Sequence, residues 1–102
     1  MKNNRRRYLS FKLHSEDSSI EEKHLNLAIW SSLLSLYGEV SAADSKLYLI
    51  EFDKRGGTGV LQCTASSLQK VITSAVLIGS IGNRLVSFEP RKTSGTLKGL
   101  KR

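Results

Sequence analysis

The chain has 102 residues, of which 39% are hydrophobic and only one is proline. This composition is typical of one folded domain and excludes a disordered chain. A single cysteine, Cys63, excludes an internal disulfide and a cysteine-based zinc site, and it favours a reducing compartment, for which we expect the cytoplasm. No apolar run is long enough to cross a bilayer or to act as a secretory signal, so we expect no membrane contact.

The net charge of +7 is concentrated at the two ends of the chain. Residues 1–13 hold five Lys and Arg and no acid, and residues 84–102 hold six against one acid. Residues 14–83 hold five basic residues against eight acidic ones. Basic ends can be solvated tails that aid solubility, or they can form a surface that binds a polyanion, and charge alone does not separate these interpretations.

The first half of the chain predicts a strand followed by a helix. Residues 8–14 place apolar side chains at every second position, which indicates a strand with one buried face. Ser18 and Ser19 each precede a Glu by three positions, which is the capping box of a helix start. The helix is expected to run to Tyr37 and to stop at Gly38.

The second half predicts a hairpin, a helix and a last strand. Residues 46–52 and 59–64 are rich in strand-forming residues and are joined by a glycine-containing turn. A helix capped by Ser66 or Ser67 is expected until Gly82-Asn83 break it. Residues 83–89 then form a strand ended by Pro90, and the polar residues 93–96 are suited to cap a short basic helix.

The element order βαββαβ predicts an α+β fold of the ferredoxin-like, split βαβ type. We expect an α/β sandwich in which an antiparallel four-stranded sheet, ordered 4-1-3-2, carries both helices on one face. The single domain, residues 1–102, is then divided into a basic N-terminal arm (1–7), a βαββαβ core (8–90) and a basic C-terminal tail (91–102).

This topology predicts that the two basic ends meet. The first and last strands are antiparallel neighbours, so the start of one lies beside the end of the other and their charges form one surface for a phosphate backbone.

Base reading by the sheet, as in an RNA-recognition motif, is not expected, because residues 59–64 contain no aromatic and Tyr8 alone faces outward. The expected RNA contacts are Arg5, Arg6, Arg7, Tyr8, Lys12, Arg91, Lys92, Thr93, Ser94, Thr96 and Lys98.

The apolar residues of the two helices are more numerous than one buried face requires. Such a wide stripe can be buried within the domain, with Trp30 in the core, or it can be an interface for a protein partner. We favour the interface, because two helices and one sheet have little surface with which to cover both stripes. Its expected residues are Leu27, Trp30, Leu34, Leu77 and Ile81.

A free-standing enzyme of the acylphosphatase type is the main alternative. That chemistry needs a glycine-rich phosphate cradle and an Arg directly after the first strand, where this chain has the acidic segment 14–17. His14 and His24 have no Cys or Ser partner fixed by spacing, and no carboxylate spacing indicates a metal site. We therefore predict no catalytic residue, no metal and no bound cofactor. A generic RNA-binding domain of another ribonucleoprotein stays open, whereas the charges give no reason for an ACT-type regulatory domain.

Five segments in their order and spacing resemble the family of archaeal ribonuclease P protein component 2, which has eukaryotic relatives. The resemblance covers nearly the whole chain, and it depends on the segments together, because no single one is highly specific. They are Arg6-Arg7-Tyr8-Leu9-Ser10-Phe11, Ile29-Trp30-Ser31-Ser32-Leu33, Leu36-Tyr37-Gly38-Glu39, Gly59-Val60-Leu61-Gln62-Cys63 and Thr93-Ser94-Gly95-Thr96-Leu97-Lys98.

The resemblance implies a non-catalytic, RNA-binding subunit of the ribonucleoprotein that removes 5′ leaders from precursor tRNA. In that endonuclease the RNA carries the chemistry, so Mg²⁺ is expected at the RNA and not on this chain. The implied partners are ribonuclease P RNA, precursor tRNA near its leader, ribonuclease P protein component 3 and other protein subunits. A homodimer within a heterotetramer is one assembly that the resemblance implies.

Overall fold

The computed structural model describes residues 5–16 and 20–100. The helix caps predicted at Ser18 and Ser19 lie outside these ranges, as do the basic residues Lys2, Lys101 and Arg102. Within the described ranges, no helix is long and apolar enough to cross a membrane.

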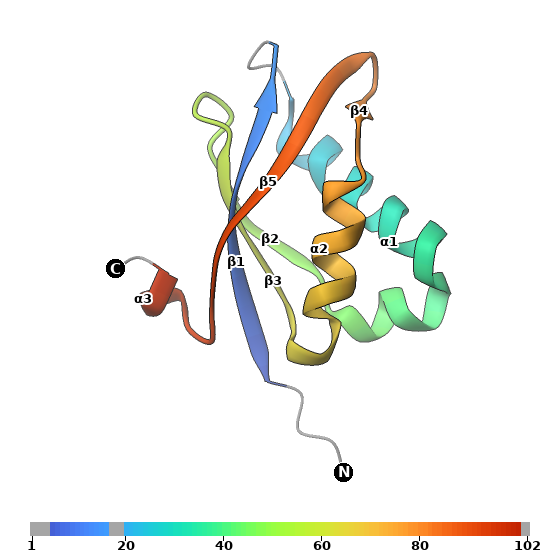
Figure 1. Ribbon diagram of the computed structural model, residues 1–102, viewed down its shortest axis with the longest axis vertical. Coiled ribbons are helices and arrows are strands. Elements are labelled where there is room, and N and C mark those ends of the chain that lie inside the picture. The colour runs from blue at the N-terminus through green and yellow to red at the C-terminus, as the bar shows by residue number, and fades with distance from the viewer. Residues whose placement is uncertain (1–4, 17–19, 101–102) are drawn as a thin grey trace.

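One five-stranded antiparallel sheet has the strand order β2-β3-β1-β5-β4. The predicted neighbours of the first strand are confirmed, and the short β4 adds a fifth strand beyond the predicted four. Figure 1 shows α1 and α2 together on one face of the sheet and α3 on the other. The elements are β1 (Arg6–Ser15), α1 (Glu22–Ser45), β2 (Tyr48–Phe52), β3 (Thr58–Thr64), the 3-10 turn η1 (Ala65–Ser67), α2 (Leu68–Val76), β4 (Ser80–Ile81), β5 (Arg84–Ser94) and α3 (Leu97–Leu100).

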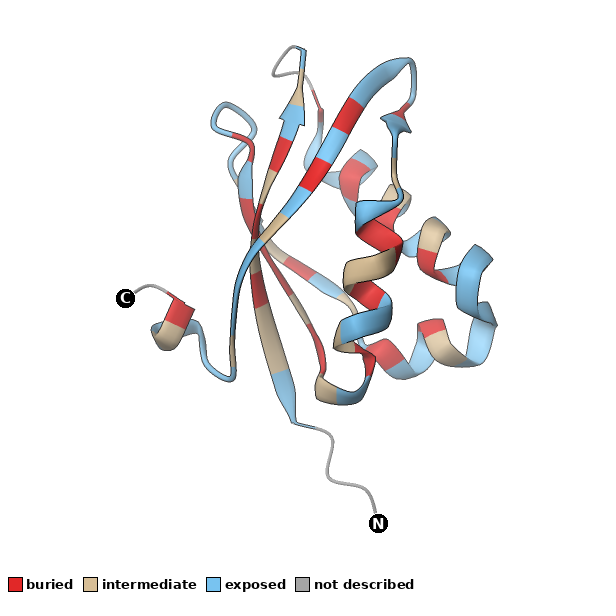
Figure 2. Cartoon of the chain, viewed as in Figure 1, coloured by how far each residue is buried: buried red, intermediate tan, exposed pale blue. Residues whose placement is uncertain are grey.

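The core lies between the sheet and the two long helices. The alternation predicted for the first strand is confirmed, because Leu9, Phe11 and Leu13 are buried. Figure 2 shows buried positions alternating with intermediate ones along β1 and with exposed ones in the first half of β5. Helix α1 contributes Leu25, Ile29 and Leu33 to the same core. A period of two in the strands and of about 3.6 in the helix directs these side chains to one layer.

Helix α1 continues beyond the end predicted for it. Gly38 interrupts the helix as expected, with φ 89° and ψ 173°, but a second helical segment follows and extends to Ser45. Lys46, in the left-handed conformation, ends that segment. Ala42 and Ser45 are buried, and the Ser45 hydroxyl donates to the carbonyl of Ala42. Tertiary burial therefore supports a turn of helix that the sequence pattern alone did not indicate.

The segment after α2 also differs from the prediction. The sequence pattern predicts a helix as far as Gly82-Asn83, but the helix ends at Val76. Residues 80–81 form the edge strand β4, which pairs with the start of β5. Gly82 and Asn83 instead form the turn between β4 and β5, where Gly82 has a φ of 63°.

Strand β5 does not end at Pro90 but runs on to Ser94. The register shifts at this point: Ser10 pairs with Lys92, whereas Phe11 pairs with Pro90, so Arg91 is the extra residue of a β-bulge. A bulge interrupts the regular ladder, and proline is tolerated there because it has no N–H to donate. The first four residues of the predicted tail thus belong to the sheet.

Candidate nucleic-acid interface

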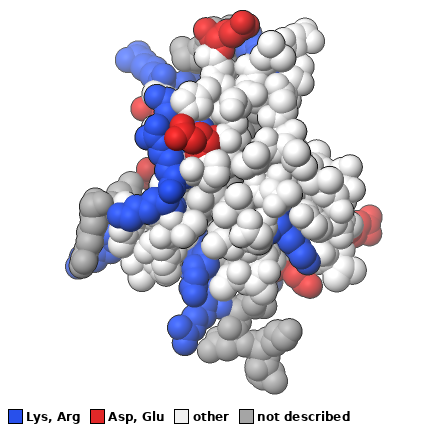
Figure 3. Space-filling view, viewed as in Figure 1, with Lys and Arg blue, Asp and Glu red and all other residues white. Residues whose placement is uncertain are grey.

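The face of the sheet that lies away from α1 and α2 is called here the outer face. Strand alternation places Tyr8, Ser10, Lys12 and His14 on it, opposite in direction to the buried Leu9, Phe11 and Leu13. Figure 3 shows Lys and Arg side chains gathered on this side of the molecule, from the β2–β3 turn down to the start of β1.

The bulge in β5 sets the direction of two adjacent basic residues. Lys92 is directly opposite Ser10, so it shares the outer face with that residue. Arg91 lines a hollow of about 230 Å³ on the same face, together with Ser10, Val60 and Leu100. In a regular strand two consecutive residues point to opposite faces, and the extra residue at the bulge removes this alternation. Both Arg91 and Lys92 therefore lie on the outer face.

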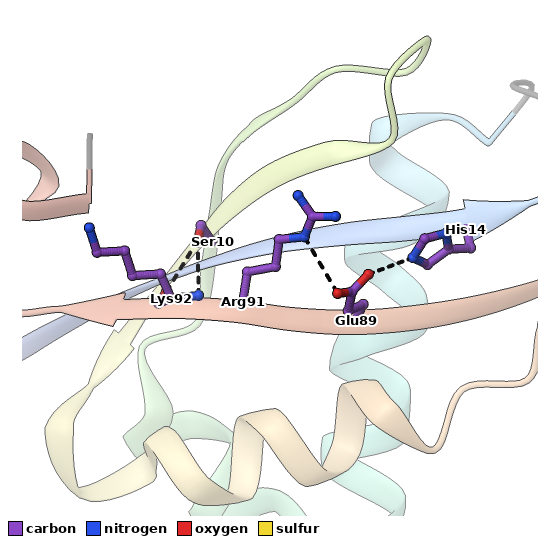
Figure 4. Close-up of polar contacts among 5 residues, drawn as sticks. All are labelled: Ser10, His14, Glu89, Arg91 and Lys92. Carbon is purple, nitrogen blue, oxygen red and sulfur yellow. Dashed lines mark hydrogen bonds and ion pairs between the residues drawn. The ribbon is translucent and has the colours of Figure 1, made fainter. Parts of the chain in front are cut away.

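Ser10 fixes the backbone of Lys92. The amide of Lys92 donates to Ser10 Oγ at 3.1 Å, and the Ser10 hydroxyl lies 3.3 Å from the carbonyl oxygen of Lys92, to which it donates. Figure 4 shows these contacts beside Arg91 and Glu89. The serine hydroxyl thus joins β1 to β5 where the bulge disturbs the regular ladder.

Glu89 places a carboxylate within this basic surface. Its Oε1 lies 2.7 Å from Nε2 of His14, and its Oε2 lies 3.6 Å from Nε of Arg91 (Figure 4). The hydrogen bond from His14, followed by the charge of Arg91, lowers the pKa of Glu89 below its ordinary value. All three side chains are about half exposed. The carboxylate is therefore ionised at neutral pH and orients an Arg that a phosphate could also bind.

The structure divides the predicted RNA contacts between two faces. Arg6, Tyr8, Lys12, Lys92 and Ser94 occupy outer-face positions in the register, and Arg91 joins them at the bulge. Arg7 and Thr93 pair with Cys63 and Leu9, two residues whose side chains are buried on the opposite face. Arg5 precedes β1, and its carbonyl accepts a hydrogen bond from Ala65.

The predicted short basic helix is present as α3. Thr96 caps it, because its Oγ1 accepts a hydrogen bond from the amide of Gly99 at 2.9 Å, and Ser94 Oγ accepts one from the amide of Thr96. Leu100 is buried and lines the hollow shared with Val60. These contacts hold α3 against the outer face and place the exposed Lys98 beside it. Thr96 and Ser94 thus position a basic residue.

Sequence reasoning missed three features of this surface: the bulge at Arg91, the contact of His14 with Glu89, and the burial of Leu100. Each depends on which residues oppose one another across strands far apart in the chain. A Pro within an otherwise strand-like segment was the one available signal of a bulge. Within the described parts of the chain, no three His, Cys, Asp or Glu side chains gather to hold a metal ion.

The predicted apolar surface on the helices is present only in part. Leu27 and Leu77 are each about 60% exposed, and Trp30 and Leu34 are each 36% exposed. Ile81 was placed wrongly: it lies in β4 and not on a helix, and only 8% of it is exposed. Strand pairing with β5 turns its side chain into the core, so it cannot belong to an exposed helix stripe. Leu27 and Ile81 nonetheless line one hollow of about 670 Å³ between α1 and the β4–β5 turn.

The fold and the outer face together define a class, namely small antiparallel α+β sandwiches with a cationic sheet face. Comparison with known proteins then identifies the family: residues 7–102 match the Rpp14/Pop5 family, and the chain belongs to it.

Two relatives are similar in sequence, and one solved structure is similar in fold. Ribonuclease P protein component 2 of Archaeoglobus fulgidus is 37% identical over 96% of this chain and 86% of its own length. Its counterpart in Pyrococcus furiosus is 34% identical over 96% of this chain and 81% of its own length. The fold also resembles a chain in the cryo-EM structure of yeast ribonuclease MRP, with a TM-score of 0.71 and 12% identity, covering 95% of this chain and 79% of that one.

Proposed function

We propose that this chain is a protein subunit of ribonuclease P that binds RNA through its outer face and supplies no catalytic group of its own. Family membership supports the assembly, since its archaeal relatives carry the name ribonuclease P protein component 2. The observation that carries RNA binding is the alignment of Arg6, Lys12, Arg91 and Lys92 on one sheet face. The ligand is then ribonuclease P RNA or precursor tRNA near its leader, and any Mg²⁺ of the reaction belongs to the RNA.

Phosphate contacts explain how this surface acts. Each Lys or Arg that neutralises a phosphate releases counterions, so affinity falls steeply as salt concentration rises. Long, exposed basic side chains on a curled sheet position an RNA backbone without reading its sequence. The subunit then supports a particular arrangement of the catalytic RNA, and Glu89 keeps Arg91 oriented until a phosphate replaces the carboxylate.

Charge reversal tests this proposal. For the double variant Arg6→Glu/Arg91→Glu, we expect a shallower slope when the logarithm of affinity for ribonuclease P RNA is plotted against the logarithm of salt concentration. The slope should decrease by roughly 0.7 to 0.9 for each phosphate that is no longer neutralised. The control is Lys23→Glu/Lys70→Glu, which changes net charge equally but lies on α1 and α2. Titrations at several salt concentrations measure both slopes. Equal slopes for the two variants would show that the outer face is not the RNA surface.

We also propose that the exposed apolar residues of α1 bind a protein partner. Leu27, Trp30 and Leu34 are spaced three and four residues apart, so they form one exposed stripe along α1. Exposed aromatic and aliphatic side chains of this kind are typical of interfaces. Ribonuclease P protein component 3 is the partner we propose for this face, with a homodimer of this chain within a heterotetramer as one arrangement.

The ferredoxin-like class is likewise our assignment. It is supported by the βαββαβ order, by the strand order in which β1 lies between β3 and β5, and by the position of α1 and α2 on one face (Figure 1). The short β4 at the edge is an addition to that plan.

A further inference from the structure

Four residues form a straight row across the outer face. Tyr48 of β2 pairs with Gln62 of β3, Gln62 pairs with Tyr8 of β1, and Tyr8 pairs with Ser94 of β5. Residues directly opposite one another in antiparallel strands project from the same face. Neighbouring strands lie about 5 Å apart, so the two tyrosines are separated by roughly 10 Å with the Gln62 amide between them.

Tyr48 adds a second aromatic side chain to a face on which the sequence predicts only Tyr8. It lies at the start of an edge strand and is brought into line by the register of β2 with β3. The central strands β1 and β3 still carry no aromatic other than Tyr8 on this face, so sequence reading of the RNA-recognition type stays unexpected, whereas stacking without sequence preference needs only exposed rings. The Tyr48 side chain is 62% exposed, while Leu49, the next residue, is buried at 5%. Tyr48 also lines a hollow of about 440 Å³ with Glu22 and Asn26 of α1 at the edge of the sheet. Most of its side chain is nevertheless exposed, so its aromatic surface can be contacted by a ligand.

Basic side chains surround this row. Arg6 and Lys46 line a hollow of about 200 Å³ together with Gln62, Cys63 and Thr64. Lys46 is fixed there by the left-handed turn that ends α1, with φ 51° and ψ 40°. Lys92 lies one outward position along β5 from Ser94. The row therefore has Arg6 and Lys46 on one side and Lys92 on the other, where Glu51 of β2 also lies on the outer face.

We infer that this row binds unpaired nucleotides of an RNA, with bases stacked on Tyr48 and Tyr8 and phosphates held by Arg6 and Lys46. The Gln62 amide can both donate to and accept from a base edge. A duplex keeps its bases stacked on one another, so it can reach the basic side chains but not the tyrosine rings. Stacking on an aromatic ring tolerates any base, which gives a preference for single strands and not for a sequence. The inference rests on the proposed function, in which the outer face binds RNA.

The test compares two labelled RNA probes at one salt concentration: a short uridylate strand and a short blunt RNA duplex. Fluorescence anisotropy with the full-length chain measures both affinities. Tyr48→Leu removes the ring but keeps an apolar side chain suited to a strand, and it should weaken binding of the single strand by roughly 5- to 100-fold. Binding of the duplex should change by less than about twofold, because its phosphates do not need the ring.

Two further variants make the outcome specific. Tyr48→Phe keeps the ring and should retain single-strand affinity, whereas Tyr37→Leu, which removes an exposed tyrosine from α1, should leave both affinities unchanged. Gln62→Leu should weaken single-strand binding while sparing the duplex. Circular dichroism confirms that each variant is folded.

Each contrary outcome has a separate meaning. Unchanged single-strand binding in Tyr48→Leu, or an equal loss for both probes, overturns the stacking row and leaves RNA binding by the basic face intact. A wild-type chain that binds neither probe overturns the proposed RNA-binding function itself. A Phe variant as weak as the Leu variant would assign the effect to the tyrosine hydroxyl and also overturn the stacking inference.

Discussion

Gly59 shows how one missing side chain organises the core. It lies on β3 between Phe11 of β1 and Phe52 of β2, and it pairs with both of them. The two rings stack across it with centroids 6.2 Å apart, and Phe11 also stacks on Phe88 at 4.6 Å. A glycine is required because a Cβ at this position would lie 2.5 Å from Cζ of Phe11 and 2.7 Å from the carbonyl oxygen of Glu51. Offset stacking then fills the space that the glycine leaves.

The first prediction concerns this position. Gly59→Ala should lower the free energy of unfolding by about 1–3 kcal/mol, because the added methyl group must displace a core ring and a backbone carbonyl. Urea denaturation followed by circular dichroism measures the change. Gly79→Ala is the matched control, since a Cβ there meets no atom within 4 Å. If the two variants are equally stable, the Phe11 ring is not held in place by close packing.

At the scale of elements, the sequence predicted the regular parts well and the interruptions poorly. The alternation of Leu9, Phe11 and Leu13 located β1, because burial on one face imposes a period of two. The end of α2, the edge strand β4 and the continuation of β5 past Pro90 were missed. The continuation of β5 depends on pairing with β1, which is far away in the sequence, and such pairing overrides local propensity. Strand β4 instead pairs with the start of β5 across the Gly82-Asn83 turn, a hairpin that the sequence pattern indicated only as the end of a helix.

The candidate site could likewise be predicted only in part. That the start of β1 lies beside the end of β5 followed from topology alone, and the register confirms it by placing Ser94 opposite Tyr8. Lys92 lies opposite Ser10, four residues along β1 from Arg6. The face on which each basic residue lies did not follow, because the bulge at Arg91 changes the alternation of every later residue in β5. Tyr48 could not be assigned to that surface before the register of β2 with β3 was available.

The break in α1 provides the second prediction. Gly38 has a φ of 89° and a ψ of 173°, a conformation that residues with a Cβ rarely adopt, although a Cβ there would meet no atom within 4 Å. Gly38→Ala should therefore lower the free energy of unfolding by about 1–3 kcal/mol through backbone strain alone. Thermal and urea unfolding measure it against Gly79→Ala. A stability gain would instead mean that α1 straightens through this position and keeps the contacts of Ala42 and Ser45.

At the scale of the whole molecule, two surfaces with different chemistry lie on opposite sides of one core. The outer face of the sheet carries the basic residues and α3 (Figures 1 and 3). Helix α1, on the other side of the core, presents the exposed apolar stripe of Leu27, Trp30 and Leu34. Because the core separates them, one chain can contact an RNA and a protein at the same time. Substitutions on one surface should then leave binding at the other unchanged.

The third prediction tests that independence. Trp30→Ala should weaken association with ribonuclease P protein component 3 by at least roughly tenfold, as is common for a partly exposed aromatic in an interface. The salt slope of RNA binding should stay as in the wild type. Pull-down titration with the purified partner measures the first effect, and the melting temperature is the control. A large fall in melting temperature with unchanged association would place Trp30 in the core.

The central position of β1 has a consequence for how the chain is made. Of the five strands this is the first to leave the ribosome, yet its neighbours are β3 and β5, and the last of these extends to Ser94. Until β5 has been synthesised, one edge of β1 has no partner, and its row of Leu9, Phe11 and Leu13 is incompletely covered. The nascent chain therefore exposes one edge of β1 and part of its apolar face during most of the synthesis of this domain. That edge is paired only when β5 emerges. Truncation within β5 should cause aggregation during expression and not merely the loss of a tail.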